Sequence, residues 1–374
     1  MKILLLCISD RWGGLERTVI RDAVALRGKG HDVAILGFAN GNIYNHARLN
    51  DLKYFSINSK PGYFNPEIYL KLRRIIKENK FDIVHIHEFK SIFPVMMALR
   101  SFKGGVFATR HIHVEHAKKD FFHRWYLSRI NMMFGISDFS KQNIISTYPI
   151  GANSVETLYL GVDLLRLKRS SGKAYIFRSK YNIHRDVKIV GVVGRIDPMK
   201  GQMEFLESIP AILDINQNVF FVVVGQPTSP DEESYLDALQ LRSKELGIED
   251  KVLFAGYFED VSIPLSAMDI LVMPSYFEAF GLIAIEAMAC EVPVVATDKG
   301  SIKEIISSPL HGIKINPRDS AAISDAVIKL LNDKALYDTI RHNALSHVKS
   351  KFDEKAYFNI LESKYNAYKG ASNA

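Results

Sequence analysis

An arginine and a lysine stand five residues apart just after an apolar segment in the second half of the chain. Gly194 and Arg195 follow KIVGVV, and Lys200 and Gly201 open the next predicted helix. Glycine loosens the backbone, while guanidinium and ammonium groups bind phosphate oxygens strongly. The pattern indicates a single loop that grips two phosphate oxygens.

Two glutamates eight residues apart form a second candidate group. Glu278 stands at a predicted helix entrance, and Glu286 lies roughly 12 Å further along that helix. Between them, Phe280, Gly281 and Leu282 enter the first turn, whose free N–H groups favour a phosphate. The carboxylates are candidates for holding sugar or ribose hydroxyls. Alternatively, Glu286 is a satisfied carboxylate inside an apolar helix, and Glu278 forms a structural ion pair with the arginine.

Two further strand ends complete a predicted nucleotide site. NVFFVVVG ends at Gly225, and KVLFAGYF places Tyr257 and Phe258 after another strand, where a base could lie against backbone and ring. A departing nucleoside diphosphate develops negative charge, which requires cationic side chains and helix-end amides in a dry cleft. The ordered set therefore predicts that the second half binds a nucleoside diphosphate.

Paired glycines follow the first predicted strand. Gly13 and Gly14 would let backbone amides approach an anion, with a helix N-terminus directly after them. The pattern is not G-x-G-x-x-G, and no acidic residue ends the second strand to hold a ribose. The pair therefore indicates either a phosphate contact or a tight strand-to-helix turn.

Histidines gather after two strands of the first half. The sequence places His85 and His87 after one strand and His111, His113 and His116 after another. Such a cluster could hold zinc, but no cysteine lies near it. We prefer His111 as a polar group that contacts the sugar or acceptor, with His85 and His87 in supporting positions.

Strand and helix patterns alternate along the whole chain. Short apolar segments such as KILLLC, DVAILGF, DIVHIH and ILVM alternate with amphipathic stretches, which predicts an α/β protein with parallel sheets. A polar, basic segment near 164–187 separates two such series and is expected to be a linker. Ligands of parallel sheets bind beyond the carboxyl ends of strands. We therefore expect two doubly wound, Rossmann-like domains that face each other across a cleft.

The ordered motifs GGLER, TRH, GVD, VGRIDPMKG and the E-x7-E within FEAFGLIAIE resemble family 4 of the retaining glycosyltransferases. The resemblance covers essentially the whole chain and implies the GT-B fold. It implies an acceptor-binding domain over 1–168, a nucleotide-sugar-binding domain over 169–354, and a C-terminal helix at about 355–374 that packs back on the first domain. The implied reaction moves a hexosyl or N-acetylhexosaminyl residue from a UDP-sugar or GDP-sugar to a saccharide or lipid-linked acceptor, in cell-envelope glycan synthesis.

The resemblance also implies roles for individual residues. It places Arg195 and Lys200 on the pyrophosphate, Glu286 on the ribose and Glu278 near the sugar hydroxyls. The remaining implied contacts are Gly281 and Leu282 as amides facing sugar and phosphate, Gly13 and Gly14 as a mobile loop over the diphosphate, and His111 beside the reacting sugar.

Two positions depart from the family pattern. Leu160 precedes Gly161-Val162-Asp163 where the family often has asparagine. Lys299-Gly300-Ser301 stands where the family often has paired glycines, although the expected Glu304 follows. The second change leaves details of the donor site open.

The sequence contains no D-x-D triplet, which metal-dependent transferases usually use to seat a divalent ion on the diphosphate. Because an arginine, a lysine and a helix dipole can neutralise that charge, we expect no catalytic metal. We expect no cofactor other than the donor substrate.

Charge is unevenly distributed along the chain. Residues 1–180 hold 29 Lys/Arg and 14 Asp/Glu, whereas the remainder holds 19 and 27 of the totals of 48 and 41. The stretch 118–127, KKDFFHRWYL, combines basic and aromatic side chains at helical spacing. It indicates either contact with an anionic membrane surface or an ordinary helix that buries its aromatic residues.

Nucleic acid is not expected as a partner, because no aromatic and basic stripe of that type accompanies the charge. Two alternatives remain open: a nucleotide-sugar epimerase of the same fold, or a peripheral membrane-binding protein without transferase activity.

The short apolar N-terminal run, closed by Asp10 and Arg11, does not predict a signal peptide. No stretch approaches the ~20 apolar residues that span a bilayer. Cys7 and Cys290 are expected to be buried thiols in a reducing compartment. We expect a cytoplasmic protein that can also bind peripherally to the inner face of the cytoplasmic membrane.

Overall fold

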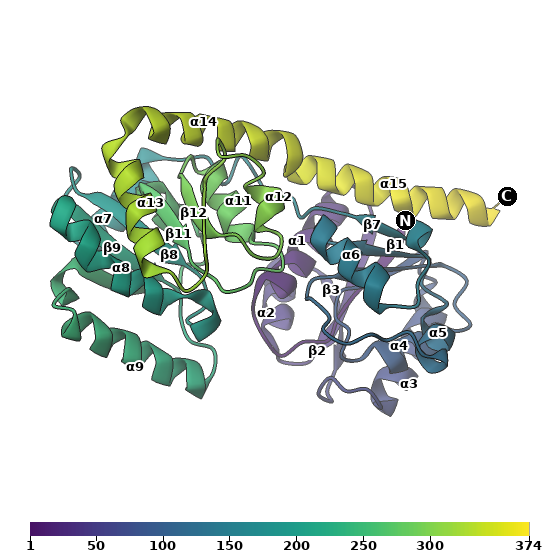
Figure 1. Ribbon diagram of the computed structural model, residues 1–374. Coiled ribbons are helices and arrows are strands. Elements are labelled where there is room, and N and C mark those ends of the chain that lie inside the picture. The colour runs from purple at the N-terminus through teal and green to yellow at the C-terminus, as the bar shows by residue number, and fades with distance from the viewer. Residues whose placement is uncertain (374) are drawn as a thin grey trace. The chain divides into compact units, whose positions relative to one another are not determined.

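The computed structural model describes residues 1–373 and divides the chain into two compact units (Figure 1). The first unit combines Met1–Tyr159 with the C-terminal segment from Lys355, and the second unit comprises Leu160–Glu354. The expected boundary at 168/169 lies later than this division. The difference arises because Leu167 and Arg169 are bonded to the second unit, through Cys290 Sγ and the Met268 carbonyl respectively.

The first unit is built on a seven-stranded sheet whose order is β3-β2-β1-β4-β5-β6-β7. Every pairing in this sheet is parallel. The strands are β1 (Lys2–Cys7), β2 (Asp32–Phe38), β3 (Lys53–Ile57), β4 (Ile83–Ile86), β5 (Gly105–Arg110), β6 (Met132–Gly135) and β7 (Val155–Thr157). The order reverses between β1 and β4, so the predicted doubly wound sheet is confirmed.

The helices of the first unit connect these parallel strands, except for the last one, which follows the second unit in the chain. They are α1 (Gly14–Gly28), α2 (Asn42–Leu49), α3 (Pro66–Asn79), α4 (Ile92–Ala98), α5 (Phe121–Leu127), α6 (Asp138–Thr147), the short 3₁₀ turn η1 (Ala152–Ser154) and α15 (Glu354–Asn373). The sequence explains their form. In α3, Asn65 caps the first turn and Ile68, Leu72 and Ile75 are buried at helical spacing.

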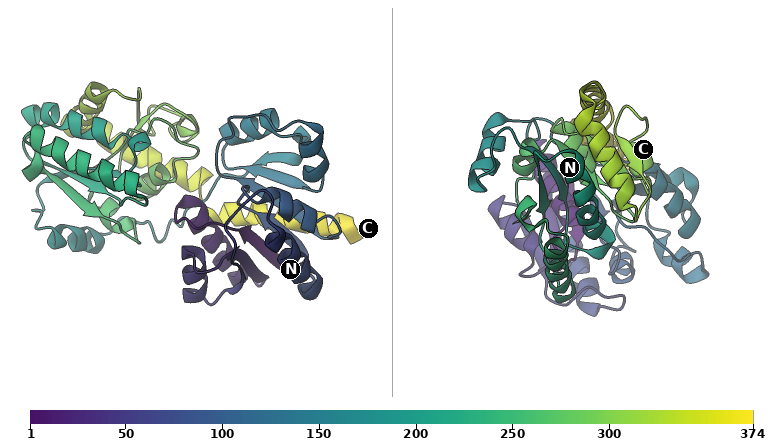
Figure 2. Two further views of the ribbon diagram at one scale, coloured as in Figure 1. Left: turned by 90° about the horizontal axis from the view of Figure 1, so that it is seen from below. Right: turned by 60° about the vertical axis from the view of Figure 1, so that its left-hand side comes forward.

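The C-terminal helix α15 packs against the first unit (Figure 2, left). Its Tyr365 is fully buried and its hydroxyl contacts Nδ1 of His85, a residue of β4. Tyr357 donates a hydrogen bond to the buried carboxylate of Asp22 at 2.6 Å. Buried hydrogen bonds of this kind hold the last helix to a sheet formed by the first 159 residues.

The second unit is built on a six-stranded parallel sheet of order β10-β9-β8-β11-β12-β13. The strands are β8 (Lys188–Val193), β9 (Val219–Val224), β10 (Val252–Gly256), β11 (Ile270–Met273), β12 (Val294–Thr297) and β13 (Ile313–Ile315). The strand order reverses between β8 and β11. Ligands of such sheets bind at this switch point, beyond the carboxyl ends of the strands.

The helices of the second unit are α7 (Ser171–Lys180), α8 (Gln202–Ile215), α9 (Pro230–Glu245), α10 (Ser262–Ala267), α11 (Leu282–Ala289), α12 (Ile302–Ile305), α13 (Ser320–Asn332) and α14 (Lys334–Lys351), with the 3₁₀ turns η2 (Pro198–Lys200) and η3 (Glu249–Lys251). A buried apolar core links α8 and α13 to the sheet through residues such as Phe205, Ile209, Val327 and Phe221.

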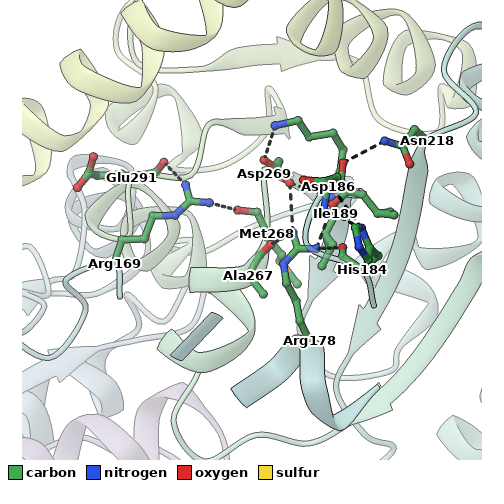
Figure 3. A network of polar contacts seen from close by, with 12 residues as sticks. Arg169, Arg178, His184, Asp186, Ile189, Asn218, Ala267, Met268, Asp269 and Glu291 are labelled. Atoms are coloured by element: carbon green, nitrogen blue, oxygen red, sulfur yellow. Dashed lines mark hydrogen bonds and ion pairs between the residues drawn. The ribbon is translucent and has the colours of Figure 1, made fainter. Parts of the chain in front are cut away.

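The expected linker near 164–187 contains the helix α7. Its N-terminus is capped by Ser170, and Phe177 is fully buried. Arg169 and Arg178 hold this segment by donating to backbone carbonyls of the second unit, and Arg178 also pairs with Asp269 at 3.8 Å (Figure 3). Arginines of this basic segment thus fasten it to carbonyls that flank β11 and α11 of the second unit.

Candidate functional site

The loops that follow β8 and β11 meet across the switch point of the second sheet. Lys200 Nζ lies 2.5 Å from Glu278 Oε1, which also accepts a hydrogen bond from Ser275 Oγ at 2.8 Å. The backbone N–H of Tyr276 donates to the Met199 carbonyl at 2.9 Å, so the two loops are also joined by main chain. The structure therefore brings together two residues that stand 78 positions apart in the sequence.

Arg195 lies in the same loop as Lys200 and is held by two acids. Its NH2 group is 2.5 Å from Asp197 Oδ2, and its Nε is 3.3 Å from Glu232 Oε1 of α9. The side chain remains 42 % exposed, and that of Lys200 31 % exposed. The cations are positioned by carboxylates yet open to solvent, so each can exchange its acid for the oxygen of a ligand.

Three glycines allow the loops at this edge of the sheet to approach one another. Gly201 (φ 71°), Gly225 (φ 151°) and Gly300 (φ 64°) have positive φ, and a Cβ on any of them would collide with a backbone carbonyl. The carbonyls belong to Pro274, Gly194 and Glu278 in that order. Because Gly225 has no Cβ, its backbone can approach the Gly194 carbonyl, and these two predicted site glycines lie together.

The Lys299-Gly300-Ser301 segment is fastened to the loop that carries Glu278. Ser301 N donates to the Glu278 carbonyl at 3.1 Å, and Ser301 Oγ donates to the Phe280 carbonyl at 2.7 Å. Within this segment, Gly300 has the left-handed backbone and the close contact. Lysine at position 299 is therefore compatible with the loop geometry.

Helix α11 begins at the predicted phosphate-facing turn. Gly281 (φ 87°) precedes its first residue, Leu282, and Phe280 is buried beneath the turn. Glu286 lies within α11 and is half-buried. The backbone therefore has the expected form at these positions, with a glycine where a left-handed residue is required.

The predicted base-contact aromatics follow β10, whose Gly256 carbonyl accepts a hydrogen bond from Gly225 N at 2.9 Å. The ring of Phe258 packs 5.5 Å from that of Phe177 in α7 and lies under the Lys180 ammonium. The hydroxyl of Tyr257 donates to Glu259 at 2.6 Å, and its ring is exposed.

In the first unit, Gly13 and Gly14 form the entrance to α1. Gly13 is the residue before the helix and has extended backbone, and a Cβ on Gly14 would meet nothing within 4 Å. Neither glycine is required by packing or by backbone strain.

Histidines of β4 and of the segments after β4 and β5 form a buried chain, and His85 lies within β4 rather than after it as expected. His87 Nδ1 lies 3.2 Å from His111 Nε2, while His85 contacts Thr109 and Tyr365. Burial lowers the pKa of His87 to about 4 and holds the pKa values of His85 and His111 well below the usual range. These imidazoles are neutral at pH 7 and act there as hydrogen-bonding groups.

Sequence reasoning missed three residues that contact Arg195 or Glu278, two of them in the loops and one in α9. Ser275 donates to Glu278, Asp197 binds Arg195 and caps η2, and Glu232 reaches Arg195 from α9. The spacing of Asp197, two residues after the arginine, was the available signal. Glu232 offered none, because only folding brings α9 beside that loop.

Within residues 1–373, no group of three His, Cys, Asp or Glu side chains is arranged to hold a metal ion. Among the same residues, no helix combines the length and the apolar character that crossing a membrane requires. Cys7 and Cys290 are buried free thiols, and burial raises the pKa of Cys290 to about 12.

Two family models together match most of the chain. Residues 12–166 match the model of Glycosyltransferase Family 4, and residues 175–347 match that of Glycosyl transferases group 1. The chain is a family 4 glycosyltransferase. The expected resemblance is thus confirmed, and the alternative of an epimerase is not favoured.

Known proteins similar to this glycosyltransferase are distant in sequence. A phosphatidyl-myo-inositol mannosyltransferase of Mycobacterium leprae is 26 % identical over 90 % of this chain and 89 % of its own. The capsular polysaccharide biosynthesis glycosyltransferase CapM of Staphylococcus aureus is 30 % identical over 62 % of this chain and 58 % of its own. The crystal structure of Anabaena HepE in complex with UDP-glucose has a TM-score of 0.84 at 21 % identity, covering 98 % of this chain and all of that one. Together with the two parallel sheets, this likeness identifies the GT-B fold.

Proposed function

We propose that this glycosyltransferase moves a hexosyl or N-acetylhexosaminyl residue from a nucleotide-diphosphate sugar to a saccharide or lipid-linked acceptor. The observation that carries the proposal is the Lys200–Glu278 pair at the switch point of the second sheet. A cation and a carboxylate 2.5 Å apart match two adjacent parts of such a donor, the anionic diphosphate and the hydroxyl-bearing sugar.

We assign roles to the surrounding residues in the same proposal. Arg195 and Lys200 stabilise the leaving diphosphate, and the first-turn amides of α11 after Gly281 face phosphate and sugar. Glu286 holds the ribose. Gly225, Tyr257 and Phe258 lie toward the base, while Gly13, Gly14 and His111 are the contribution of the first unit. The donor is a UDP-sugar or a GDP-sugar.

The proposed reaction retains the anomeric configuration. The bond from the sugar C1 to the phosphate oxygen breaks while the acceptor oxygen bonds to C1 on the same face. The proton of the acceptor hydroxyl passes to the departing phosphate. Because Arg195, Lys200 and helix-end amides can carry the leaving charge, we propose that no divalent metal and no further cofactor are required.

We further propose a place in cell-envelope glycan synthesis, with the protein in the cytoplasm and in contact with the inner face of the membrane. The names of the mannosyltransferase and CapM relatives support the first part. Helix α5 supports the second: Phe121 is 84 % exposed, and Phe122 and Trp125 are partly exposed. Because Asp120 caps α5, the preceding lysines lie outside the helix, and only Tyr126 and Leu127 are buried.

A radiolabelled donor panel tests the transferase proposal. The full chain is incubated with UDP- and GDP-sugars and chelator, with and without saccharide or polyprenyl-phosphate-linked acceptors. Transfer with retained configuration in the presence of chelator is expected. Interconversion of the donor without an acceptor would contradict the proposed transferase activity. Transfer that requires added divalent metal would contradict the proposed metal independence.

A flotation assay tests the membrane contact separately. The protein is expected to float with vesicles containing phosphatidylglycerol and to lose this binding when Phe121 and Trp125 are replaced by serine. Equal flotation of the variant and the parent would contradict a role of α5.

A further inference from the structure

One arginine beside the histidine chain has no counter-charge. Arg110 ends β5, immediately before His111, and its guanidinium lies 4.8 Å from the ring centre of Phe89. Within residues 1–373 its side chain makes no hydrogen bond and no ion pair, and its Nε is buried without a partner. A partly buried guanidinium usually binds a carboxylate or carbonyl, so the missing partner needs an explanation.

A lysine lies near this arginine and is equally uncompensated. Lys118 Nζ is 5.9 Å from the ring centre of Tyr148 and has no acid within ion-pair distance among the described residues. Burial, followed by the charge of Arg110, lowers the pKa of Lys118. The Tyr148 hydroxyl is itself buried without a partner in the described chain, and its ring lies 6.0 Å from that of Phe89.

The backbone of the loop that carries Lys118 is fixed by hydrogen bonds to α6. Lys118 N donates to the Thr147 carbonyl at 2.6 Å, and Val114 exchanges two hydrogen bonds with the side chain of Asn143 at 2.8 and 2.9 Å. Both anchors belong to α6, which Tyr148 follows directly. The lysine is therefore held near Tyr148 by the fold rather than by an attraction to an acid.

Glu88, whose pKa the charge of Arg110 lowers against the larger effect of burial, does not pair with that arginine in the described residues. Glu88 uses its carboxylate to accept from the backbone N–H groups of Lys90 and Ser91. Burial raises the pKa of Glu88 to about 7, so its negative charge is only partly developed at neutral pH. The positive charges of Arg110 and Lys118 thus remain available to a ligand.

We propose that Arg110 and Lys118 form a subsite for a phosphate group of the acceptor, next to His111 in the first unit. The inference rests on the proposed function and narrows its acceptor to one that carries a phosphate near the hydroxyl to be glycosylated. A phosphate supplies the oxygen acceptors that both uncompensated cations lack, and a guanidinium binds it through two parallel hydrogen bonds.

Calorimetric titration with glycerol 1-phosphate tests the subsite. The titration uses full-length Lys200→Ala protein, so that the donor loop does not contribute to phosphate binding. Adding Arg110→Gln and Lys118→Gln is expected to weaken binding about tenfold or more, because charge-assisted bonds are lost. Lys119→Gln, which removes the same charge from the neighbouring exposed residue, is expected to leave binding unchanged. Arg110→Lys retains the charge but not the two parallel hydrogen bonds of a guanidinium, so it is expected to bind more weakly than the parent and more tightly than Arg110→Gln.

A second arm distinguishes a lipid headgroup from a soluble phosphate ester. The same variants are tested for flotation with phosphatidylglycerol vesicles and with phosphatidylcholine vesicles as the neutral control. Loss of binding in the double variant with either source supports the subsite and identifies that source. The subsite proposal is overturned if the double variant binds glycerol 1-phosphate and the vesicles as well as the Lys200→Ala parent does. It is also overturned if that parent binds neither.

The outcome is separable from that of the proposed function. Nucleoside diphosphate binding is measured on Arg110→Gln/Lys118→Gln protein with Lys200 intact and is expected to equal that of the wild type. If the wild type binds no nucleotide, the transferase proposal fails whatever the glycerol phosphate result. If nucleotide binds normally, but all variants bind glycerol 1-phosphate and vesicles as tightly as the parent does, only the subsite proposal fails.

Discussion

At the scale of single residues, the donor-side cations are paired with acids before any ligand arrives. Lys200 contacts Glu278, and Arg195 contacts Asp197 and Glu232. In each pair the cation is the more exposed partner, at 31 or 42 %, against 12–17 % for the carboxylates. The proposed function requires a diphosphate to replace the acids at these exposed cations.

Replacing Lys200 by alanine is expected to lower kcat/KM about 100-fold to 1000-fold, as for the loss of one donor that stabilises developing charge. Glu278→Ala is expected to be similarly damaging. The double variant should lose much less than the product of the two, because the residues contact each other. Steady-state kinetics with the donor found in the panel provide the measurement.

Lys244→Ala, on the exposed surface of α9, serves as the matched control and should retain full activity. Wild-type rates in Lys200→Ala protein would contradict the proposed role of Lys200. A double variant whose loss equals the product of the two single losses would contradict a joint role of Lys200 and Glu278.

The buried histidines give stability a defined pH dependence. Burial lowers the pKa of His87 to about 4, so the unfolded chain binds its proton more tightly than the folded protein does. Stability is unaffected above about pH 6.5 and falls as pH decreases toward 4, by on the order of 3 kcal/mol for this residue. Denaturant unfolding of wild type and His87→Gln from pH 7.5 to 4.5 should show a shallower decline for the variant.

Glu88 should behave in the opposite sense. Its pKa is raised to about 7, so it contributes stability that is fully present below about pH 4.5 and is lost as pH rises through 7. Between about pH 4.5 and pH 7, Glu88→Gln protein is therefore expected to lose less stability than the wild type does. Curves for either variant that run parallel to the wild type would show that the group does not titrate as described.

At the scale of elements, the site depends on loops that touch through backbone atoms. Gly201 contacts the loop after β11, Gly225 the loop after β8, and Gly300 the Glu278 carbonyl. A side chain at any of these positions would separate loops that carry the proposed donor contacts. The geometry of Glu278 is therefore set as much by Gly300 as by Lys200.

Two glycine substitutions separate backbone strain from steric collision. Gly300 and Gly247 have nearly equal φ, 64° and 65°, but a Cβ on Gly247 meets nothing within 4 Å. Gly247→Ala is expected to cost about 1 kcal/mol through the backbone alone. Gly300→Ala should cost more and also weaken nucleotide binding, because the Glu278 loop must shift.

Thermal unfolding and nucleotide titration of both variants provide the measurement. Equal stability losses together with unchanged nucleotide affinity in Gly300→Ala protein would refute this account of the loop.

At the scale of the whole molecule, two units with separate cores carry different parts of the proposed function. The residues proposed for nucleotide binding all lie within Leu160–Glu354, apart from Gly13 and Gly14. A ligand stabilises the unit that binds it by about 2.7 kcal/mol at a hundredfold excess over Kd. Nucleotide should therefore act mainly on the second unit.

Differential scanning calorimetry with and without UDP or GDP tests this expectation. We expect one component of the unfolding endotherm to move upward by several degrees for the correct nucleotide. Tryptophan fluorescence offers a matched report on the first unit, because Trp12 and Trp125 both lie there. A fluorescence transition that moves as far as the calorimetric one would show that both units bind nucleotide or unfold together.

Much of the architecture follows from the sequence because apolar strands buried on both faces produce continuous Val, Ile and Leu segments. KILLLC and ILVM could therefore be predicted from the sequence as the strands β1 and β11. The four strands β3, β6, β7 and β13 were not singled out, since they are short or partly exposed and lack such a segment. The helix α7 was taken for linker because its buried face rests largely on Phe177.

The sequence by itself determined the types and order of the donor-side residues, because a glycine, an arginine and a lysine in one loop are local features. Tertiary structure alone decided which of them meet. It joined Lys200 to Glu278 across the strand-order reversal and left Phe258 against α7. Among residues 1–373, it also left Arg110 and Lys118 without an acid within ion-pair distance. Pairing between distant positions is set by strand order and loop contact, which no local pattern of residues encodes.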